Sequence, residues 1–299
     1  FSDPGTFEVT QETDDAPAGY DYYLRAEVTT QAALSYGYHV IGQAIERYDM
    51  AGFDWGLTTG RAAALTFNVR SSVTGTYYGV VQYGVYSYVF SYTVPVADEW
   101  LRRIITVPAP PAAAPDLGDA ELVVIEWSLG GTVGETLSLN QWQASEVRRG
   151  ESDAGVIGTL GGTWDLTGVQ FEPAPATQFE WLPKWAQEGL VKRYFQAVEF
   201  DGSPMVLGTG VAISTTVARV LCPLPFALRS PPDVVIESPT NVVLQGAFGT
   251  IVPASVTLVS PADSGMVAGV ALEVTVAAGL TAGQAVILRV DAGTVLFDS

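Results

Sequence analysis

The sequence offers few residues that could carry out acid–base or nucleophilic chemistry. His39 is the only histidine and Cys222 the only cysteine. A Ser-His-Asp triad would need His39 as its base, but His39 lies between Tyr38 and Val40 in a predicted strand, without a nucleophile-elbow motif. Cys222 precedes Pro223 in an apolar run, which predicts a buried, inert thiol. These counts exclude disulfide frameworks and zinc sites built on Cys and His.

Paired carboxylates are the remaining route to catalysis, because two acids on opposite sides of a sugar bond can hydrolyse a glycan. The chain has 32 Asp and Glu residues, so neighbouring acids arise by chance. The pairs Asp98-Glu99 and Asp14-Asp15 both fall in predicted turns, where solvated side chains explain them. No catalytic residue is predicted, and glycan hydrolysis stays an alternative without an identified acid pair.

Aromatic side chains are the stronger chemical signal. Sugars present C–H faces that stack on Tyr and Trp rings, while polar neighbours bind the hydroxyl groups. Tyr83 and Trp142 fall among Gly, Asn and Gln in predicted turns or loops, so we expect their rings to be exposed. Trp55 lies in another loop, and Tyr86 and Tyr88 share one face of a strand. The predicted carbohydrate-binding residues are therefore Trp55, Tyr83, Tyr86, Tyr88 and Trp142.

The alternative for the strand face is core packing, with the hydroxyl groups reaching the rim. Tyr92 lies in the middle of the same strand between apolar neighbours, and we predict that it is buried. We expect Trp164 and Phe171 in the core as well. The sequence leaves open which of the remaining tyrosines face a ligand.

The charge balance narrows the class of partner. The chain has 14 Lys and Arg against 32 Asp and Glu, a net charge of −18, and its only lysines are Lys184 and Lys192. Nucleic acids and anionic membranes attract clustered basic residues, so neither is an expected partner. No apolar run reaches the roughly 18 residues of a membrane-spanning helix, so no membrane insertion is expected. We interpret the acidity as a contribution to solubility.

Short alternating segments separated by glycine and proline predict an all-β protein. The 299 residues are 48% hydrophobic and include 31 Gly and 18 Pro, which suits two domains built from strands and turns. Residues 108–115 are a polyproline-like loop within the first domain. The strands predicted there are 22–28, 38–45, 63–70, 77–82, 85–94, 102–107, 121–129 and 156–166. Many short antiparallel strands at this spacing predict a jelly-roll β-sandwich.

A short helix is predicted to divide the chain. Pro183 suits a first helical turn, Glu188 precedes Lys192 by four residues, and Arg193 suits the C-terminal end of the helix dipole. Beyond it, strands are predicted at 206–213, 217–222, 234–237, 256–259, 270–276 and 285–290. The predicted organisation is a carbohydrate-binding-like jelly-roll domain (1–182), a helical connector (183–196) and a second, smaller β-sandwich domain (197–299).

One stretch of the chain resembles a known signature. Thr167-Gly-Val-Gln-Phe-Glu172, Ala176-Thr-Gln-Phe-Glu180 and Arg193-Tyr-Phe195 resemble the "TGVQLE … ATPFE … RYY" signature that ends the carbohydrate-binding-like β-sandwich of phage tail-fibre and tail-spike proteins. Two earlier landmarks of that family are similar to Ile45-Glu-Arg-Tyr48 and to the stretch from Leu65 to Tyr77, in the same order. A weaker similarity to related tail proteins covers the stretch from Leu221 to Pro232 and the end of the chain.

The resemblance implies a bacteriophage tail-fibre protein on the virion tail, acting at the exterior of the bacterial host. It implies receptor binding, in which the jelly roll attaches the virion to a host cell-surface glycan by non-covalent contacts. The implied partners are that glycan, other virion tail proteins and further copies in a homotrimer. Two alternatives stay open: a purely structural virion component (decoration, collar or baseplate protein) and a glycan-degrading tail-spike enzyme. The short repeated coils of parallel β-helix spikes are absent from this sequence.

No cofactor is predicted, apart from a structural Ca²⁺ that the resemblance allows. Jelly rolls related to carbohydrate-binding modules often hold Ca²⁺ through loop carboxylates and carbonyl groups. Asp3, Asp14 and Asp15 are the candidate ligands, although no ligand spacing marks them.

Overall fold

A computed structural model describes residues 5–32, 38–111, 123–131, 138–145, 154–200, 204–229, 232–236, 241–259, 267–291 and 293–298. The chain divides into two compact units, Phe1–Glu180 and Trp181–Ser299. Within the described residues, strands are accompanied by one α-helix and two short 3₁₀ helices, η1 (Arg47–Phe53) and η2 (Val156–Gly158). The predicted all-β class is therefore confirmed. The helix predicted as a separate connector at 183–196 lies within the second unit. A connector that is distinct from both domains stays a prediction.

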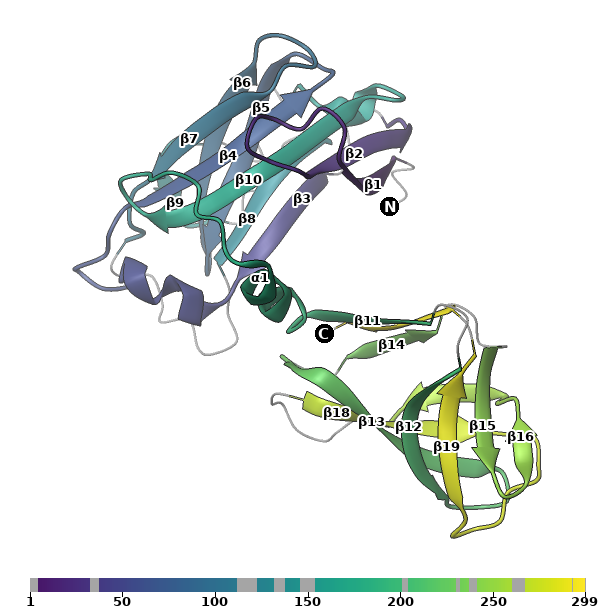
Figure 1. Ribbon diagram of the computed structural model, residues 1–299. Coiled ribbons are helices and arrows are strands. Elements are labelled where there is room, and N and C mark those ends of the chain that lie inside the picture. Colours follow the sequence, from purple (N-terminus) through teal and green to yellow (C-terminus); the bar gives the residue numbers. More distant parts are fainter. Residues whose placement is uncertain are drawn as a thin grey trace. The chain divides into compact units, whose positions relative to one another are not determined.

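The first unit is a jelly-roll sandwich of two five-stranded antiparallel sheets, seen as two layers in Figure 1. Sheet A has the order β1-β2-β10-β4-β7, formed by Thr6–Glu12, Tyr23–Thr30, Thr163–Pro173, Ala63–Ser71 and Leu101–Val107. Sheet B has the order β3-β8-β5-β6-β9, formed by Tyr38–Ile45, Val123–Gly131, Gly75–Tyr83, Tyr86–Val94 and Trp142–Gln143. Large alternating side chains fill the space between the sheets, as the sequence pattern predicts.

The core of this sandwich is aromatic. Phe67 of β4 lies 5.3 Å from the Tyr92 ring and 5.6 Å from the Trp127 ring, both on sheet B. Trp164 of β10 is completely buried, and its Nε1 donates to the Tyr92 hydroxyl at 3.1 Å. The predicted burial of Tyr92 and Trp164 is confirmed, and Phe171 is half-buried against the same core. A buried indole whose N–H has a hydrogen-bond acceptor contributes apolar burial without leaving that N–H unpaired.

The strand predicted at 156–166 is wrong at its beginning. Residues Val156–Gly158 form η2, whose Val156 and Ile157 are fully buried. Gly155 and Gly161 adopt positive φ angles of 56° and 70°, and such angles interrupt an extended chain on both sides of η2. β10 therefore begins only at Thr163 and continues to Pro173.

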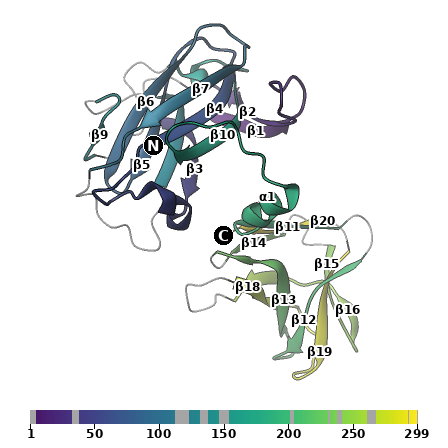
Figure 2. The same cartoon turned by 60° about the vertical axis from the view of Figure 1, so that its left-hand side comes forward.

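The second unit contains a seven-stranded and a three-stranded antiparallel sheet. The larger has the order β16-β15-β19-β12-β13-β18-β17, formed by Gly249–Ile251, Val242–Gly246, Ala285–Val290, Met205–Ala212, Val217–Leu228, Val267–Thr275 and Ser255–Leu258. Figure 2 shows β12, β13 and β19 side by side. The smaller has the order β11-β20-β14, formed by Phe195–Phe200, Gly293–Asp298 and Asp233–Ile236. Cys222 is buried in this unit's core, where desolvation raises the pKa of its thiol to about 12.

The α-helix of this unit, α1, is shorter than predicted. It spans Lys184–Val191 instead of 183–196. The predicted pairing within the helix is present, because Glu188 lies 3.7 Å from Lys192 and 3.6 Å from Lys184. From Phe195 onward the chain pairs with β20, opposite Asp298. Pairing with a distant strand therefore overrides the local helical preference.

Candidate functional site

Four of the five predicted sugar-binding residues meet at one end of the sandwich. The Trp55 ring lies 5.6 Å from the rings of both Tyr83 and Trp142, and 5.8 Å from Phe171. The Tyr88 ring lies 5.6 Å from Trp142. These rings come from the loop after η1 and from β5, β6, β9 and β10, whose ends meet here. We call this set the aromatic end cluster: Phe53, Trp55, Tyr83, Tyr88, Trp142 and Phe171.

Three polar atoms of the aromatic end cluster are bonded to the protein's own backbone. Trp55 Nε1 donates to the carbonyl oxygen of Arg61 at 2.8 Å, and Trp142 Nε1 donates to that of Pro108 at 2.7 Å. The Tyr88 hydroxyl donates to the Thr106 carbonyl at 3.2 Å, and burial raises its pKa. Rings with these bonds close the end of the core.

Burial further limits which cluster rings can stack on a sugar. Trp55, Tyr83 and Tyr88 are only 8%, 7% and 4% exposed. The expected exposure of Tyr83 is wrong, because Gly56, with φ of +86°, brings the loop backbone against its hydroxyl. Trp142 and Tyr86 are half-buried. A sugar-binding role for these five residues stays a prediction, and Trp142 and Tyr86 are the least buried of them.

The outer face of sheet A buries a charged cluster. Asp165 is 1% exposed and accepts from Arg25 Nε and Nη2, both at 2.9 Å, and from Arg70 Nε at 2.8 Å. Arg70 Nη1 also donates to Asp15 Oδ2 at 2.6 Å. The hydrogen bond to Asp165 is the largest cause that raises the pKa of Arg25. We call Asp15, Arg25, Arg70 and Asp165 the charged cluster.

Two aromatic rings enclose the charged cluster. The Arg70 guanidinium lies 4.6 Å from the Trp100 ring centroid and 5.1 Å from that of Tyr23. Trp100 Nε1 donates to the carbonyl oxygen of Asp15 at 2.8 Å, which ties the loop between β1 and β2 to the sheet. Since each charge of this cluster faces an opposite charge, its geometry is that of a structural site.

The calcium candidates do not converge in the described part of the chain. Asp15 faces Arg70, and Asp3 lies outside the described residues. No group of three or more His, Cys, Asp or Glu among the residues described is arranged to hold a metal ion. Structural calcium, with Asp14 and the others as ligands, therefore stays a prediction.

The outer face of sheet B carries a row of polar side chains. Ser87 of β6 lies opposite Gln82 of β5 on one side and Gln143 of β9 on the other. Directly opposed residues of antiparallel strands point to the same face, with Cβ atoms about 5 Å apart. We call Gln82, Ser87 and Gln143 the polar row. Gln143 Oε1 accepts from the Ser138 amide at 3.3 Å.

Two donors of the polar row lack an acceptor. Gln82 Nε2 and Gln143 Nε2 are buried and have no hydrogen-bond partner among the residues described. A buried donor without an acceptor costs about 1–3 kcal/mol, so such groups are rare and call for an explanation. Two of them flank one serine here, which concentrates unused donors in one place.

The neighbouring positions complete the outer face of sheet B. Val80 and Val89 lie directly opposite each other beside the polar row, and both are fully buried at 0% exposure. Glu126 of β8 lies opposite Val80, and it is 6% exposed. Tyr78 lies on the same face and is also buried. Amides, hydroxyl groups and a carboxylate around an apolar floor form the kind of surface that binds a polar, non-planar ligand.

Sequence reasoning missed Gln82 and Gln143. The signal was present in β5, where Tyr78, Val80 and Gln82 alternate with core residues. Because this segment is almost continuously apolar, the sequence pattern did not distinguish the residues on its outer face from those in the core. Gln143 lies in a two-residue strand that only pairing with β6 defines.

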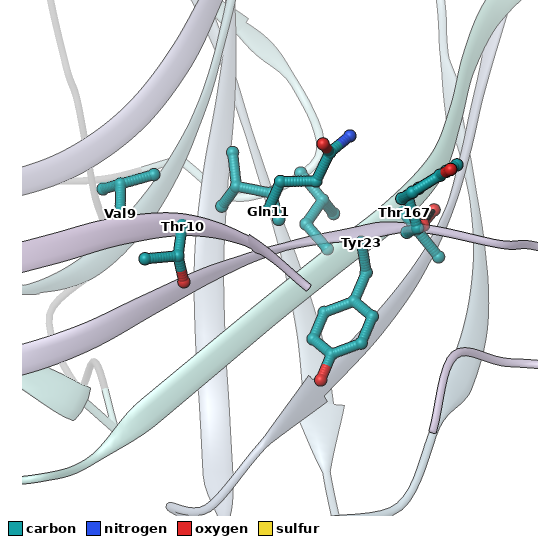
Figure 3. A pocket seen from close by; sticks show the side chains of 8 residues that line it. Val9, Thr10, Gln11, Tyr23 and Thr167 are labelled. Atoms are coloured by element: carbon teal, nitrogen blue, oxygen red, sulfur yellow. Dashed lines mark hydrogen bonds between the residues drawn. The ribbon is translucent and has the colours of Figure 1, made fainter. Parts of the chain in front are cut away.

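A concave surface lies at the β1 edge of sheet A, shown in Figure 3. It is a shallow cleft of about 440 Å³, and Val9 and Gln11 point to one side of β1 while Thr10 points to the other. Tyr22, which is 54% exposed, borders it, but Thr167 Oγ1 already donates to the Tyr22 carbonyl oxygen at 2.8 Å. Its lining is Val9, Thr10, Gln11, Tyr22, Tyr23, Leu24, Leu166 and Thr167.

The residues that carry the family resemblance form a loop that is held by hydrogen bonds among its own residues. Glu172 accepts at Oε1 from the Thr177 amide at 2.6 Å and from Gln170 Nε2 at 2.8 Å. The Glu180 amide in turn donates to Gln170 Oε1 at 2.7 Å. Burial raises the pKa of Glu172, but hydrogen bonds from Thr177 and Gln170 outweigh it and lower the pKa. These residues of the signature fix the exit from β10.

Gly168 explains another position of the signature. Its φ of +60° belongs to the left-handed region, and the register shifts between Thr167 and Gln170 at this point. A Cβ atom there would lie 2.5 Å from the Tyr20 hydroxyl, whose ring packs on Phe179 at 5.3 Å. Only glycine therefore fits both the bulge and its cover.

His39 lies in a structural setting. Its ring packs edge-to-face on Phe7 at 5.8 Å between β3 and β1. This agrees with the structural role that the sequence predicts for it. Among the described residues, no helix is long and apolar enough to cross a membrane.

Neither a protein-family model nor a curated protein matches this chain. A family 11 carbohydrate-binding module of Clostridium thermocellum, in complex with a β-1,3-1,4-mixed-linked tetrasaccharide, is similar at 10% identity and a TM-score of 0.32, over 59% of this chain and 88% of that chain. A family 30 carbohydrate-binding module is similar at 12% identity and 0.34, over 63% and 88%. An exo-β-agarase is similar at 10% identity and 0.34, over 69% and 37%. All these TM-scores are below 0.5, so the proposals below rest on this chain's own residues.

Proposed function

We propose that this protein binds a glycan without covalent chemistry, on the outer face of sheet B. The observation that carries the proposal is the pair of buried amide donors, Gln82 Nε2 and Gln143 Nε2, which have no acceptor in the part of the chain that the structure describes. Sugar hydroxyl groups are acceptors as well as donors, and their binding would satisfy both amides. Glu126, on the next row of the same face, would accept from a sugar hydroxyl.

The half-buried aromatic rings of the same strands lie on the other face of sheet B. Trp142 adjoins Gln143 on β9 and Tyr86 adjoins Ser87 on β6, and successive residues of a strand point to opposite faces. Both rings pack against the core between the two sheets. The proposed contact on the outer face therefore depends on its polar groups, above the apolar side chains of the same face.

The biological role that we propose is attachment of a phage virion to a host-surface glycan. The support is the signature at Thr167–Glu172 and Ala176–Glu180, which resembles that of tail-fibre proteins. The protein would then be located on the virion tail, as a homotrimer together with other tail proteins. Several weak sites on one fibre would give avidity on a glycan-covered cell.

The test is a titration of the intact protein with host capsular and lipopolysaccharide glycans, chosen from a glycan array. We expect Gln82→Ala and Gln143→Ala each to weaken binding at least ~10-fold, the range for a lost buried hydrogen bond. Gln11→Ala, in the cleft of Figure 3, is the matched control and should bind normally. Loss of binding in Gln11→Ala alone would move the site to the cleft.

A purely structural virion role is the second candidate, because large apolar side chains lie on the surface of the second unit. Trp185 is 77% exposed and Leu221 60%, and exposed apolar patches mark contacts with other proteins. An array without any glycan response, together with assembly into virions, would favour this role over glycan binding.

A further inference from the structure

The polar row is part of a longer row of outward side chains that crosses all five strands of sheet B. From β3 to β9, its directly paired members are Ala44, Val124, Gln82, Ser87 and Gln143. Directly opposed residues of antiparallel strands point to the same face. Ala44, at the β3 end, is exposed. We call these five residues the extended row.

The strands of sheet B provide no basic side chain that could hold an acidic sugar. Within the bounds given above, β3, β5, β6, β8 and β9 contain no Lys or Arg, and Glu126 is their one acidic residue. Glu126 lies on the outer face, opposite Val80 on one side and Gly42 on the other. A Cβ atom on Gly42 would lie 2.9 Å from Glu126 Cγ, so the glycine leaves room for this side chain.

The arginines of the first unit whose side chains the structure describes belong to the other sheet. Arg61 comes just before β4, and the strands of sheet A contain Arg25, Arg70, Arg102 and Arg103. Arg25 and Arg70 are bound to Asp165. Arg103 Nη2 donates to the Thr93 carbonyl oxygen of β6, but Thr93 is six residues from Ser87, or about 20 Å along an extended strand. The described positive charges are therefore concentrated on sheet A.

Uncharged and acidic sugars differ in what they need from such a face. A carboxylate, sulfate or phosphate that loses its water needs charge-assisted hydrogen bonds, which Arg and Lys supply. A hydroxyl group needs only ordinary donors and acceptors. The extended row offers neutral amide donors, Gln82 Nε2 and Gln143 Nε2, and the Glu126 carboxylate beside it can accept from a hydroxyl group.

The charge of the whole first unit acts in the same direction. Residues 1–180 contain 8 Lys and Arg against 23 Asp and Glu, a net charge of −15. The summed field of such a unit repels an anion before it reaches the face. At the face itself, Glu126 would be a like charge to any acidic sugar bound beside the polar row.

We propose that the glycan site on sheet B takes an uncharged glycan segment and discriminates against glycans that carry carboxylate, sulfate or phosphate groups. This selectivity rests on the proposed function, because it places the ligand on the same face. Gln82 and Gln143 donate to sugar hydroxyl groups. The discrimination comes from Glu126 and from strands that offer the ligand neutral donors only.

The test compares one glycan in uncharged and acidic forms. The probe is the uncharged glycan that the intact protein binds most tightly on an array. Oxidation of its primary hydroxyl groups to carboxylates gives the acid form, and conversion of those carboxylates to amides removes the charge again. Calorimetric titration should show at least ~10-fold weaker binding of the acid form, and the amide form should recover most of that loss.

Salt separates the effect of charge from the effect of shape. The Debye length falls from about 30 Å at 0.01 M to about 3 Å at 1 M ionic strength. The affinity of the acid form should therefore rise with salt, because screening weakens its repulsion by the first unit. The uncharged form should bind with nearly the same affinity at both concentrations.

An added lysine tests the same face by mutation. Ala44→Lys places an ammonium group at the exposed end of the extended row, and at low salt it should strengthen binding of the acid form about 3-fold. Binding of the uncharged form should not change. Leu160→Lys is the matched control, because it changes the net charge equally at a 64% exposed residue outside sheet B. Circular dichroism checks that both variants fold.

The possible results distinguish the charge class from glycan binding itself. An acid form that binds as tightly as the uncharged form would overturn the proposed selectivity and leave glycan binding on sheet B intact. An amide form as weak as the acid form would also overturn it, because the loss would then come from the missing hydroxyl groups. If neither charged nor uncharged glycans bind, the selectivity and the proposed function both fail.

Discussion

The two outer faces of the first unit bury polar groups in opposite ways. On sheet A, Asp165 and Arg70 are buried, and each faces at least one opposite charge within 2.9 Å. On sheet B, the side-chain amide nitrogens of Gln82 and Gln143 are buried and lack acceptors within the described ranges. Both faces belong to strands of the same sandwich, so architecture alone does not distinguish them.

The difference separates a structural site from a candidate binding site. A satisfied buried network holds the chain in one arrangement, and removing one partner leaves an uncompensated charge. A buried donor without an acceptor lowers stability, and a ligand that supplies the acceptor recovers that loss. We therefore expect mutations on sheet A to change stability, and mutations on sheet B to change binding.

The largest effect should follow from breaking the charged cluster. Asp165→Asn leaves Arg70, which is 5% exposed, without its main counter-charge, so the free energy of unfolding should fall by about 3–5 kcal/mol. Urea denaturation at pH 7 measures it. Asp291→Asn removes a more exposed partner of Arg289 and should cost at most about 1 kcal/mol. Equal losses in the two variants would contradict the structural assignment.

The aromatic end cluster should behave like the charged cluster and unlike the polar row. Trp55→Ala removes a ring that is 8% exposed and contacts four aromatic neighbours. The resulting cavity should lower the free energy of unfolding by about 3 kcal/mol. Well below its unfolding temperature, the variant should bind glycan as the parent protein does. Weaker binding with unchanged stability would return Trp55 to the sugar site.

The polar row should show the reverse pattern. Gln82→Leu replaces a buried donor that has no acceptor among the residues the structure describes, so the free energy of unfolding should stay equal or rise by about 1 kcal/mol. Glycan affinity should nevertheless fall at least ~10-fold. Thermal unfolding and titration calorimetry on the same preparation give both values. A loss of stability with normal affinity would make the polar row structural.

The smallest effect concerns the loop after β10. The pKa of Glu172 is lowered in the folded protein, against its burial, by hydrogen bonds from Thr177 and Gln170. Its stabilising contribution is therefore present above the unfolded pKa and is lost as the pH falls through the folded pKa. Glu172→Gln should remove this acid-dependent part and speed amide exchange at Thr177, measured by hydrogen exchange. An unchanged exchange rate in the variant would show that Glu172 does not hold the loop.

The sequence predicted the strands of the first unit better than their faces. Alternation placed Leu65, Phe67 and Val69 of β4 on one face, and the structure buries all three. The same reasoning expected Tyr83 outside, because Gly84 marks a turn after it. Alternation says nothing about a loop 27 residues earlier, whose Gly56 backbone covers the ring.

Distances across the chain account for the rest of what sequence reasoning missed. Asp165 lies 140 residues from Arg25 and 95 from Arg70, so no local pattern marks the cluster. Helix α1 was predicted too long because its last residues favour a helix locally, whereas pairing of Phe195 with Asp298 decides their structure. The polar row likewise exists only through the register of β5, β6 and β9.

Titration of the double variant Gln82→Ala/Gln143→Ala with the glycan that the parent protein binds tests the central claim most directly. The account predicts that binding is lost or weakened at least ~100-fold, since two hydrogen bonds are removed, while the unfolding midpoint does not fall. Full affinity in the double variant, with the parent protein measured in parallel, would contradict the assignment of the site to sheet B.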